Sequence, residues 1–252
     1  AYGRLEKFPV PSGGVSVIHV MAPLTLLILT RFGIPVSTTF LVLSVFAPGN
    51  IDSMLVKSLT GYAVAFVVAI IVFRFVIQRV NAYFQSTSDQ PIPRYWIGVQ
   101  WAATAFLWSQ WLIQDLANIF VFLPRDVGIS TLLFGVAALV AMQGVIFYQQ
   151  GGRIQQIVTT KTMTHDIRAA SIIDFIYGII LLIFKEWSNM PMSTTWVFLG
   201  LLAGRELAMT LQFGNRTIGQ TAALVGRDAG KALGGLVISV ILAYTALWLG
   251  AT

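Results

Sequence analysis

The sequence predicts an all-α polytopic membrane protein made of inverted repeats, with two re-entrant helical hairpins and one broken helix. Of its 252 residues, 56% are hydrophobic and only 10% are charged, whereas a soluble domain carries roughly 25% charged residues. One polar stretch occurs twice, as Pro-Val-Ser-Thr-Thr at 35–39 and as Pro-Met-Ser-Thr-Thr at 191–195. Three apolar segments lie between the two copies, and an odd number of crossings places the copies on opposite membrane faces.

Each copy of this stretch is expected to interrupt a helix. Proline lacks a backbone N–H and disfavours helical geometry in the residue before it. In a bilayer, a broken helix is stable only where it is buried in protein or lines a cavity. The apolar piece at 40–47 is too short to cross, because a crossing helix needs about 20 residues. We therefore predict a re-entrant hairpin over 15–47, with the motif at its tip, and a second hairpin over 169–203.

The remaining elements follow from the alternation of apolar and polar stretches. Residues 1–14 are polar and predict an aqueous lead-in. One long apolar helix is predicted over 95–123, broken at Gln-Asp-Leu-Ala-Asn 114–118. Further membrane-spanning helices are predicted over 54–77, 129–148 and 233–249, with polar connectors at 79–94, 149–168 and 205–231.

The chain divides into two unequal repeats. Residues 1–90 form the C-terminal part of the first repeat, and residues 91–252 form the second. Similar sequences follow both motifs, Lys-Ser-Leu-Thr-Gly at 57–61 and Lys-Ala-Leu-Gly-Gly at 231–235, so the repeat extends beyond the motif. If residues 15–32 crossed the membrane completely, the hairpins would not be inverted.

The distribution of cations predicts the orientation. In this topology one face receives ten cations: Arg74, Arg79, Arg94, Arg153, Lys161, Arg168, Arg205, Arg216, Arg227 and Lys231. The other face receives four: Arg4, Lys7, Lys57 and Arg125. Cytoplasmic loops are enriched in Lys and Arg, so the first face is predicted to be cytoplasmic. The C-terminus is then outside, and the location expected is the bacterial inner membrane.

These motifs resemble those of the inorganic phosphate transporter (PiT) family. That family repeats a G-[LI]-P-V-S-T-T-H hairpin signature, similar to residues 33–40 and 189–196, and a G-A-N-D-V-A-N-A signature, similar in its core to residues 114–118. Residues 151–174, which lead into the second hairpin, also look like the second half of that family. The resemblance covers nearly the whole chain and implies inverted repeats and sodium/phosphate symport.

The chain departs from the family pattern at four positions and at its start. Phe40 and Trp196 stand where the hairpin signature ends in His. Gln114 replaces the Asn before the acidic residue, and Asn189 replaces Gly. The resemblance implies an Asn-Asp-x-x-Asn helix in the first repeat as well, and this first signature helix is expected upstream of residue 1, absent from this chain.

The hydroxyl groups of the two motifs are the candidate substrate ligands. A helix that restarts after proline directs its free N–H groups and positive dipole end towards the cavity, which favours an anion. Ser and Thr there can alternatively cap the helix. The candidate anion-binding residues are Ser37, Thr38, Thr39, Ser193, Thr194 and Thr195.

Asp115 and Asn118 are the candidate cation ligands, together with Gln114. Asp115 and Asn118 are three residues apart and share a helix face. A carboxylate at membrane depth is costly and usually faces a cavity or a partner. Carboxylate and carboxamide oxygens suit Na⁺ better than a soft metal. Alternatively, Asp115 only joins helices through an Arg or a hydroxyl group.

Three further polar residues have weaker assignments. Arg31 precedes the first proline by four residues and either approaches the anion or extends to the membrane surface. Asp174 is expected to take part in packing more than in cation binding. His19 is expected to be a core histidine.

We therefore predict a secondary transporter that moves inorganic phosphate, or sulfate, coupled to Na⁺ or H⁺ by alternating access. The alternative is a PiT-derived subunit that does not transport and acts as a scaffold in a larger complex. Besides the lipid bilayer, the expected partner is a second copy or another subunit that supplies the missing helix. No catalytic motif, metal site or cofactor is predicted, because the sequence contains none of the motifs typical of them. No nucleic-acid surface is predicted, because the basic residues are scattered through short loops.

Overall fold

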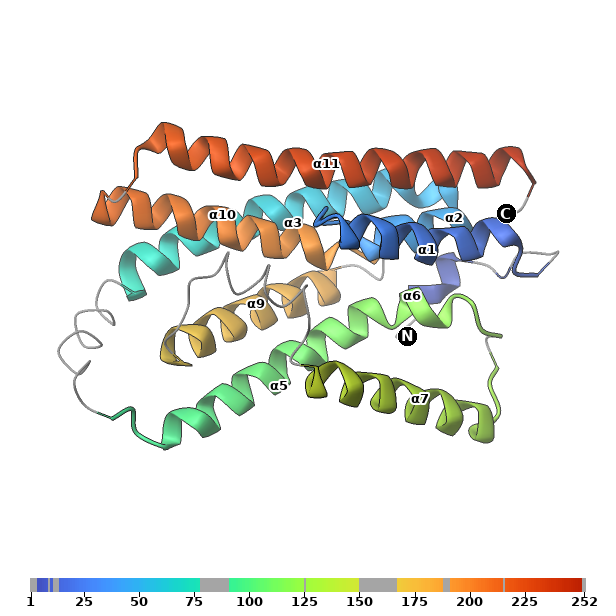
Figure 1. Cartoon of the computed structure of the whole chain (residues 1–252), viewed down its shortest axis with the longest axis horizontal. Coiled ribbons are helices and arrows are strands. Elements are labelled where there is room, and N and C mark those ends of the chain that lie inside the picture. Colours follow the sequence, from blue (N-terminus) through green and yellow to red (C-terminus); the bar gives the residue numbers. More distant parts are fainter. Residues whose placement is uncertain are drawn as a thin grey trace.

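The computed structural model describes residues 4–8, 10, 14–77, 91–124, 126–149, 167–187, 191–214 and 216–250. Every regular element in these ranges is helical (Figure 1). In chain order they are η1 Arg4–Lys7, α1 Val17–Arg31, η2 Thr39–Leu43, α2 Ser44–Phe46, η3 Pro48–Asn50, α3 Ile51–Val72, η4 Phe73–Ile77, α5 Tyr95–Asp115, α6 Ala117–Phe120, α7 Ile129–Tyr148, α9 Ile167–Trp187, α10 Thr194–Phe213 and α11 Ile218–Trp248. Some residues used in the sequence analysis lie outside the described ranges: Arg79, Arg125, Arg153, Lys161 and Asn189.

The chain has the properties of a helical membrane protein. Three of its described helical stretches are long and apolar enough to cross a bilayer: Pro48–Phe75, Ile129–Tyr148 and Ile218–Trp248. A crossing helix needs about 20 residues. α7 has the bounds predicted from the sequence, and α3 with η4 contains the predicted span 54–77. The shorter helix Val17–Arg31 is also apolar.

The polar connector predicted over 205–231 is wrong, because most of it is helical. α10 continues to Phe213 and ends at Gly214, whose φ of +60° is accessible to a residue without Cβ. α11 begins only four residues later. The backbone N–H of Gln220 donates to Thr217 Oγ1 at 3.2 Å, and the N–H of Thr217 donates to Gln220 Oε1 at 3.0 Å. This Thr-x-x-Gln capping box begins the helix despite the polar residues that follow.

The predicted break in the helix over 95–123 is narrower than expected. α5 ends at Asp115 and α6 begins at Ala117, so only Leu116 separates them. Leu116 keeps helical backbone angles, φ −60° and ψ −26°. Asp115 and Asn118 therefore lie on either side of a small irregularity rather than in an extended segment.

The α3–α10 pair is the most extensive helix interface, and two glycines allow its close approach. A Cβ atom at Gly200 would overlap the carbonyl oxygen of Tyr62, and one at Gly204 would overlap that of Phe66. Small residues spaced by four bring membrane helices into backbone contact, which matters because lipid removes the hydrophobic driving force between helices. α5 and α9 form a second pair.

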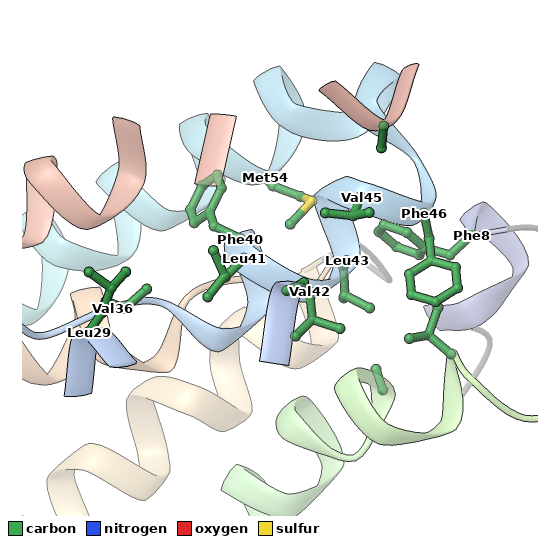
Figure 2. Close-up of a cluster of buried hydrophobic side chains, with 14 residues drawn as sticks. Phe8, Leu29, Val36, Phe40, Leu41, Val42, Leu43, Val45, Phe46 and Met54 are labelled. Carbon is green, nitrogen blue, oxygen red and sulfur yellow. The ribbon is translucent and has the colours of Figure 1, made fainter. Parts of the chain in front are cut away.

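A cluster of apolar side chains surrounds the helical turns that follow the first motif (Figure 2). Phe40, Leu41 and Leu43 are completely buried. Phe46 packs on the ring of His19, with 4.4 Å between ring centroids. His19 is fully buried and its Nδ1 accepts from the N–H of Ser16 at 3.1 Å, which agrees with a role in packing.

The two polar motifs approach each other from opposite ends of the molecule. α1 begins near the end at which α11 finishes, whereas α9 begins at the other end, where α10 finishes (Figure 1). α7 differs from the other long helices, since none of its residues is buried. Residues of both motifs, among them Ser37 and Ser193, are buried, whereas α7 is mostly exposed and has no buried residue.

Candidate functional site

Two reciprocal hydrogen bonds join the two Pro-x-Ser-Thr-Thr motifs. The hydroxyl of Thr39 donates to the carbonyl oxygen of Met192 at 3.2 Å. The hydroxyl of Thr195 donates to the carbonyl oxygen of Val36 at 3.3 Å. Thr39 and Thr195 are equivalent positions of the repeated sequence, as are Val36 and Met192. Each motif therefore makes the same contact with the other.

The serine of each motif caps the helical turn that follows it. Ser37 Oγ accepts from the N–H of Phe40 at 3.2 Å, and Ser193 Oγ accepts from the N–H of Trp196 at 3.1 Å. Both serines are buried, with exposed fractions of 5% and 0%. The N–H of Ser193 also donates to Ser58 Oγ at 2.9 Å. Capping, the alternative to anion binding, is thus what both serine side chains do in this structure.

The central threonine of the second motif lies beside the candidate cation ligands. Thr194 Oγ1 is 3.4 Å from Asp115 Oδ2, and Asn118 Nδ2 is 3.4 Å from Asp115 Oδ1. The hydroxyl of Tyr177 donates to the carbonyl oxygen of Thr194 at 2.8 Å. Thr38, the equivalent residue of the first motif, is half-buried. Its hydroxyl makes no hydrogen bond within the part of the chain that the structure describes.

The side chains around Asp115 supply several oxygen atoms. Gln114 is completely buried and Asn118 is 5% exposed, whereas Asp115 is half-buried. The Oδ1 atom of Asn118 has no hydrogen-bond partner among the described residues. A buried carbonyl oxygen without a partner is unfavourable, and beside a carboxylate it offers a ligand for a hard cation.

Two equivalent glycines support the motifs from behind. A Cβ atom at Gly61 of α3 would lie 3.6 Å from Met192 Sδ, and one at Gly235 of α11 would lie 3.1 Å from Val36 Cγ2. These glycines end the two similar sequences 57–61 and 231–235. Each long helix thus packs a glycine against the opposite motif, and a larger side chain there would crowd Val197 at Gly61 and Val36 at Gly235.

Asp174 and Arg31 occupy other surroundings. The carboxylate of Asp174 accepts from Thr104 Oγ1 at 2.7 Å and from Gln100 Nε2 at 3.0 Å. These bonds join α9 to α5. Arg31 is exposed at the end of α1.

Sequence reasoning missed Ser58, Tyr177 and the Gly200–Gly204 pair. Ser58 lies within the repeated 57–61 segment, which could have singled it out. The Gly-x-x-x-Gly spacing in an apolar helix is a known packing signal. Tyr177 lies in an apolar helix without any sequence feature that would have indicated its bond to Thr194.

These observations define a helical membrane protein whose two proline-containing motifs meet in its interior beside a carboxylate. Comparisons of the chain with protein-family models, with curated proteins and with solved structures found no match.

Proposed function

We propose that this protein is a secondary transporter that moves inorganic phosphate, or a similar tetrahedral oxyanion, coupled to Na⁺ or H⁺. The observation that carries the proposal is the reciprocal pair of hydrogen bonds from Thr39 and Thr195, with Asp115 next to the second motif. Secondary transporters with inverted repeats bind their substrates where broken helices from opposite faces meet. The resemblance of both motifs to the PiT family supports the same assignment.

Within the six motif hydroxyls, we assign the anion to Thr38 and Thr194. The two serines cap their own helices, and Thr39 and Thr195 hold the motifs together. Thr38 can donate to an anion, and the Thr194 hydroxyl, which donates to Asp115 Oδ2 at 3.4 Å, can turn to an anion once a cation or a proton neutralises that carboxylate. The N–H groups at the helix starts and the positive ends of their dipoles add to this attraction.

Asp115, Asn118 and Gln114 are assigned to the coupling cation. The Asp115 carboxylate repels an anion held by Thr194, because their separation would be only a few ångströms. Na⁺ at Asp115, or a proton on it, removes this repulsion. Binding of the cation and of the anion therefore strengthen each other equally, as thermodynamic linkage requires, and this mutual dependence is the basis of coupling.

In this proposal, 15–47 and 169–203 act as re-entrant hairpins of two inverted repeats. Access to the site alternates when the hairpins rock against the long helices. The hydrogen bonds of Thr39 and Thr195 hold the two motifs together in the conformation described here, and rocking of the hairpins would break them. The orientation follows the distribution of cations, with the C-terminus outside.

The direct test is uptake of radiolabelled phosphate into vesicles that contain the purified protein, with imposed Na⁺ or proton gradients. Asp115→Asn is expected to abolish gradient-driven uptake, and Thr194→Val is expected to weaken it, while both proteins still fold. Thr245→Val is the matched control, because Thr245 is a half-buried helical threonine away from the motifs whose hydroxyl donates to the carbonyl oxygen of Ile241 at 2.8 Å. Uptake at the wild-type rate in both site variants would contradict the proposal.

One observation favours a second function, that of a subunit which does not transport. α7 buries none of its residues in this chain, so it is available to another membrane subunit. A scaffold of this kind would give no uptake under any gradient and would migrate, after mild solubilisation, at the mass of a defined larger complex. Uptake by the purified chain alone would exclude it.

A further inference from the structure

A basic cavity lies between α3, α10 and α11, apart from the paired motifs. Its volume is 390 Å³. Four cations line it, Arg205, Arg216, Arg227 and Lys231, against two carboxylates, Glu206 and Asp228. Such an excess of positive charge in a concave site attracts anions.

Arg205 is the buried cation of this cavity, and its guanidinium keeps donors without acceptors. The residue is 7% exposed, and its Nε and Nη1 atoms make no hydrogen bond within the described ranges. Nη1 lies 3.7 Å from Glu206 Oε1, and the guanidinium carbon lies 5.7 Å from the Phe73 ring centroid. Buried charged donors are nearly always hydrogen-bonded, so the missing acceptors point to a ligand.

The carboxylate beside Arg205 is already engaged. Arg216 Nη1 donates to Glu206 Oε2 at 2.9 Å, so the charge of Glu206 is shared between two arginines. The positive charges of Arg205, Arg227 and Lys231 then outnumber the single negative charge of Asp228. Guanidinium groups offer a planar set of donors that matches phosphate oxygens in pairs.

The charged residues that α11 contributes to the cavity precede the uncharged part of this helix. α11 has 31 residues, which is about 46 Å at 1.5 Å per residue, whereas the hydrocarbon core is about 30 Å thick. Residues 232–248 contain no charged side chain, whereas Arg227, Asp228 and Lys231 precede them. With the uncharged part in the hydrocarbon, the first turns of α11 would extend into the interface.

An apolar boundary separates the cavity from the motifs. Trp196, Leu199 and Ala232 form a buried cluster, with Tyr62 packed against it. Leu199 and Tyr62 also line the cavity. A ligand in the cavity is thus on the other side of this cluster from Ser193 and Thr194.

We infer that this basic cavity binds a phosphate group, either that of an anionic lipid or free inorganic phosphate. The site is additional to the proposed transport site and does not depend on it. Short cytoplasmic loops rich in Lys and Arg explain exposed cations. They do not explain a buried arginine whose Nε and Nη1 donors lack acceptors among the described residues.

The test compares Arg227→Gln/Lys231→Gln with a matched control, Arg74→Gln/Arg94→Gln. Arg227 is exposed and Lys231 half-buried, so their loss leaves the packing intact. Arg74 and Arg94 are exposed and lie outside the cavity. The test has two arms. The first arm uses four proteins that all carry Thr194→Val, which weakens the proposed transport site. They are the Thr194→Val parent, the two double variants and an Arg205→Lys variant.

In the first arm, inorganic phosphate is titrated calorimetrically into detergent-purified protein. If free phosphate is the ligand, each removed cation weakens binding about fivefold, so the cavity variant loses about 25-fold and the control is unchanged. Arg205→Lys keeps the charge but loses paired donors, and it also weakens binding. In the second arm, wild type, cavity variant and control without Thr194→Val are reconstituted in phosphatidylcholine nanodiscs with and without phosphatidic acid. If lipid is the ligand, phosphatidic acid raises the melting temperature of wild type and control more than that of the cavity variant.

A response in either arm that is specific to the cavity supports the inference and identifies the source of the phosphate group. If the cavity variant and the control behave identically in both arms, the inference is wrong. Neither outcome depends on whether the protein transports phosphate, because no readout here involves uptake.

Discussion

The two Pro-x-Ser-Thr-Thr motifs have nearly the same sequence and the same mutual contacts, yet their surroundings differ. The second motif leads into α10, a regular helix of 20 residues, and its central threonine faces Asp115. The first motif leads into the π-helical turn Thr39–Leu43 and the short α2, and Thr38 faces no carboxylate in the described residues. The repeated residues therefore set the capping and the contact between motifs, whereas the neighbouring helices set the chemistry of each one.

The neighbour that makes the difference is the α5–α6 segment. It brings Asp115 and Asn118 to the second motif. The central threonine is thus a buried hydroxyl beside a carboxylate in one copy and a half-buried hydroxyl in the other. Chemical asymmetry arises here from packing, while the motifs themselves remain alike.

The largest expected effect tests the packing behind the second motif. Gly204→Leu places a side chain against the carbonyl of Phe66 in α3, and overpacking of this kind costs about 1–3 kcal/mol or more. Because this interface is the most extensive in the molecule, we expect loss of the monodisperse peak in size-exclusion chromatography.

Gly234→Leu is the matched control for that change. A Cβ atom at Gly234, on the same long helix as Gly235, would meet no atom within 4 Å. We expect this variant to purify like wild type. Equal yields of the two variants would show that the close approach of α3 and α10 is not needed for folding.

The second prediction breaks the asymmetry between the motifs at its source. Asp115→Asn removes the negative charge beside Thr194. The attraction between this carboxylate and a cation ~4 Å away is on the order of 4 kcal/mol, so its loss should weaken cation binding by ~1,000-fold. Gradient-driven phosphate uptake should fall to background. The control is Asp174→Asn, since Asp174 bonds to Thr104 and Gln100 between α5 and α9. If the Asp174 variant loses uptake while the Asp115 variant keeps it, the assignment of the cation site is wrong.

The sequence predicts features that depend on local patterns, but it does not predict contacts that depend on how distant helices pack. The two motifs, the contact between them and the pairing of Asp115 with Asn118 follow from local patterns and the repeated sequence. The bond from the Tyr177 hydroxyl to the carbonyl oxygen of Thr194 does not, because these two groups are brought together only by the packing of α9 on α10. The prediction of a connector over 205–231 is wrong because polar residues on α10 and α11 do not prevent helix formation, and the cap at Thr217 and Gln220 begins α11 within this range.

The third prediction compares the two central threonines. Thr194→Val should raise the phosphate concentration for half-maximal uptake. Because the Thr194 hydroxyl also lies against Asp115 Oδ2, it should change the Na⁺ dependence too, by up to roughly tenfold, since a hydrogen bond to a charged group contributes about 1.5 kcal/mol or more. Thr38→Val should raise the phosphate concentration for half-maximal uptake and leave the Na⁺ dependence unchanged. Rates measured over a grid of both concentrations separate the two effects. Identical shifts in both variants would mean that Asp115 acts on the two motifs alike.

The smallest effect concerns what the motifs share. Thr39→Val and Thr195→Val each remove one of the reciprocal bonds, and hydrogen bonds between membrane helices contribute about 0.6 kcal/mol on average. We expect small and equal decreases in melting temperature in detergent. The double variant should lose less than the sum, because once one bond is gone the motifs separate more easily and the other bond is worth less. A strictly additive double variant would mean that the two bonds act independently. Unequal single variants would mean that the surroundings, rather than the repeated residues, determine the contact between the motifs.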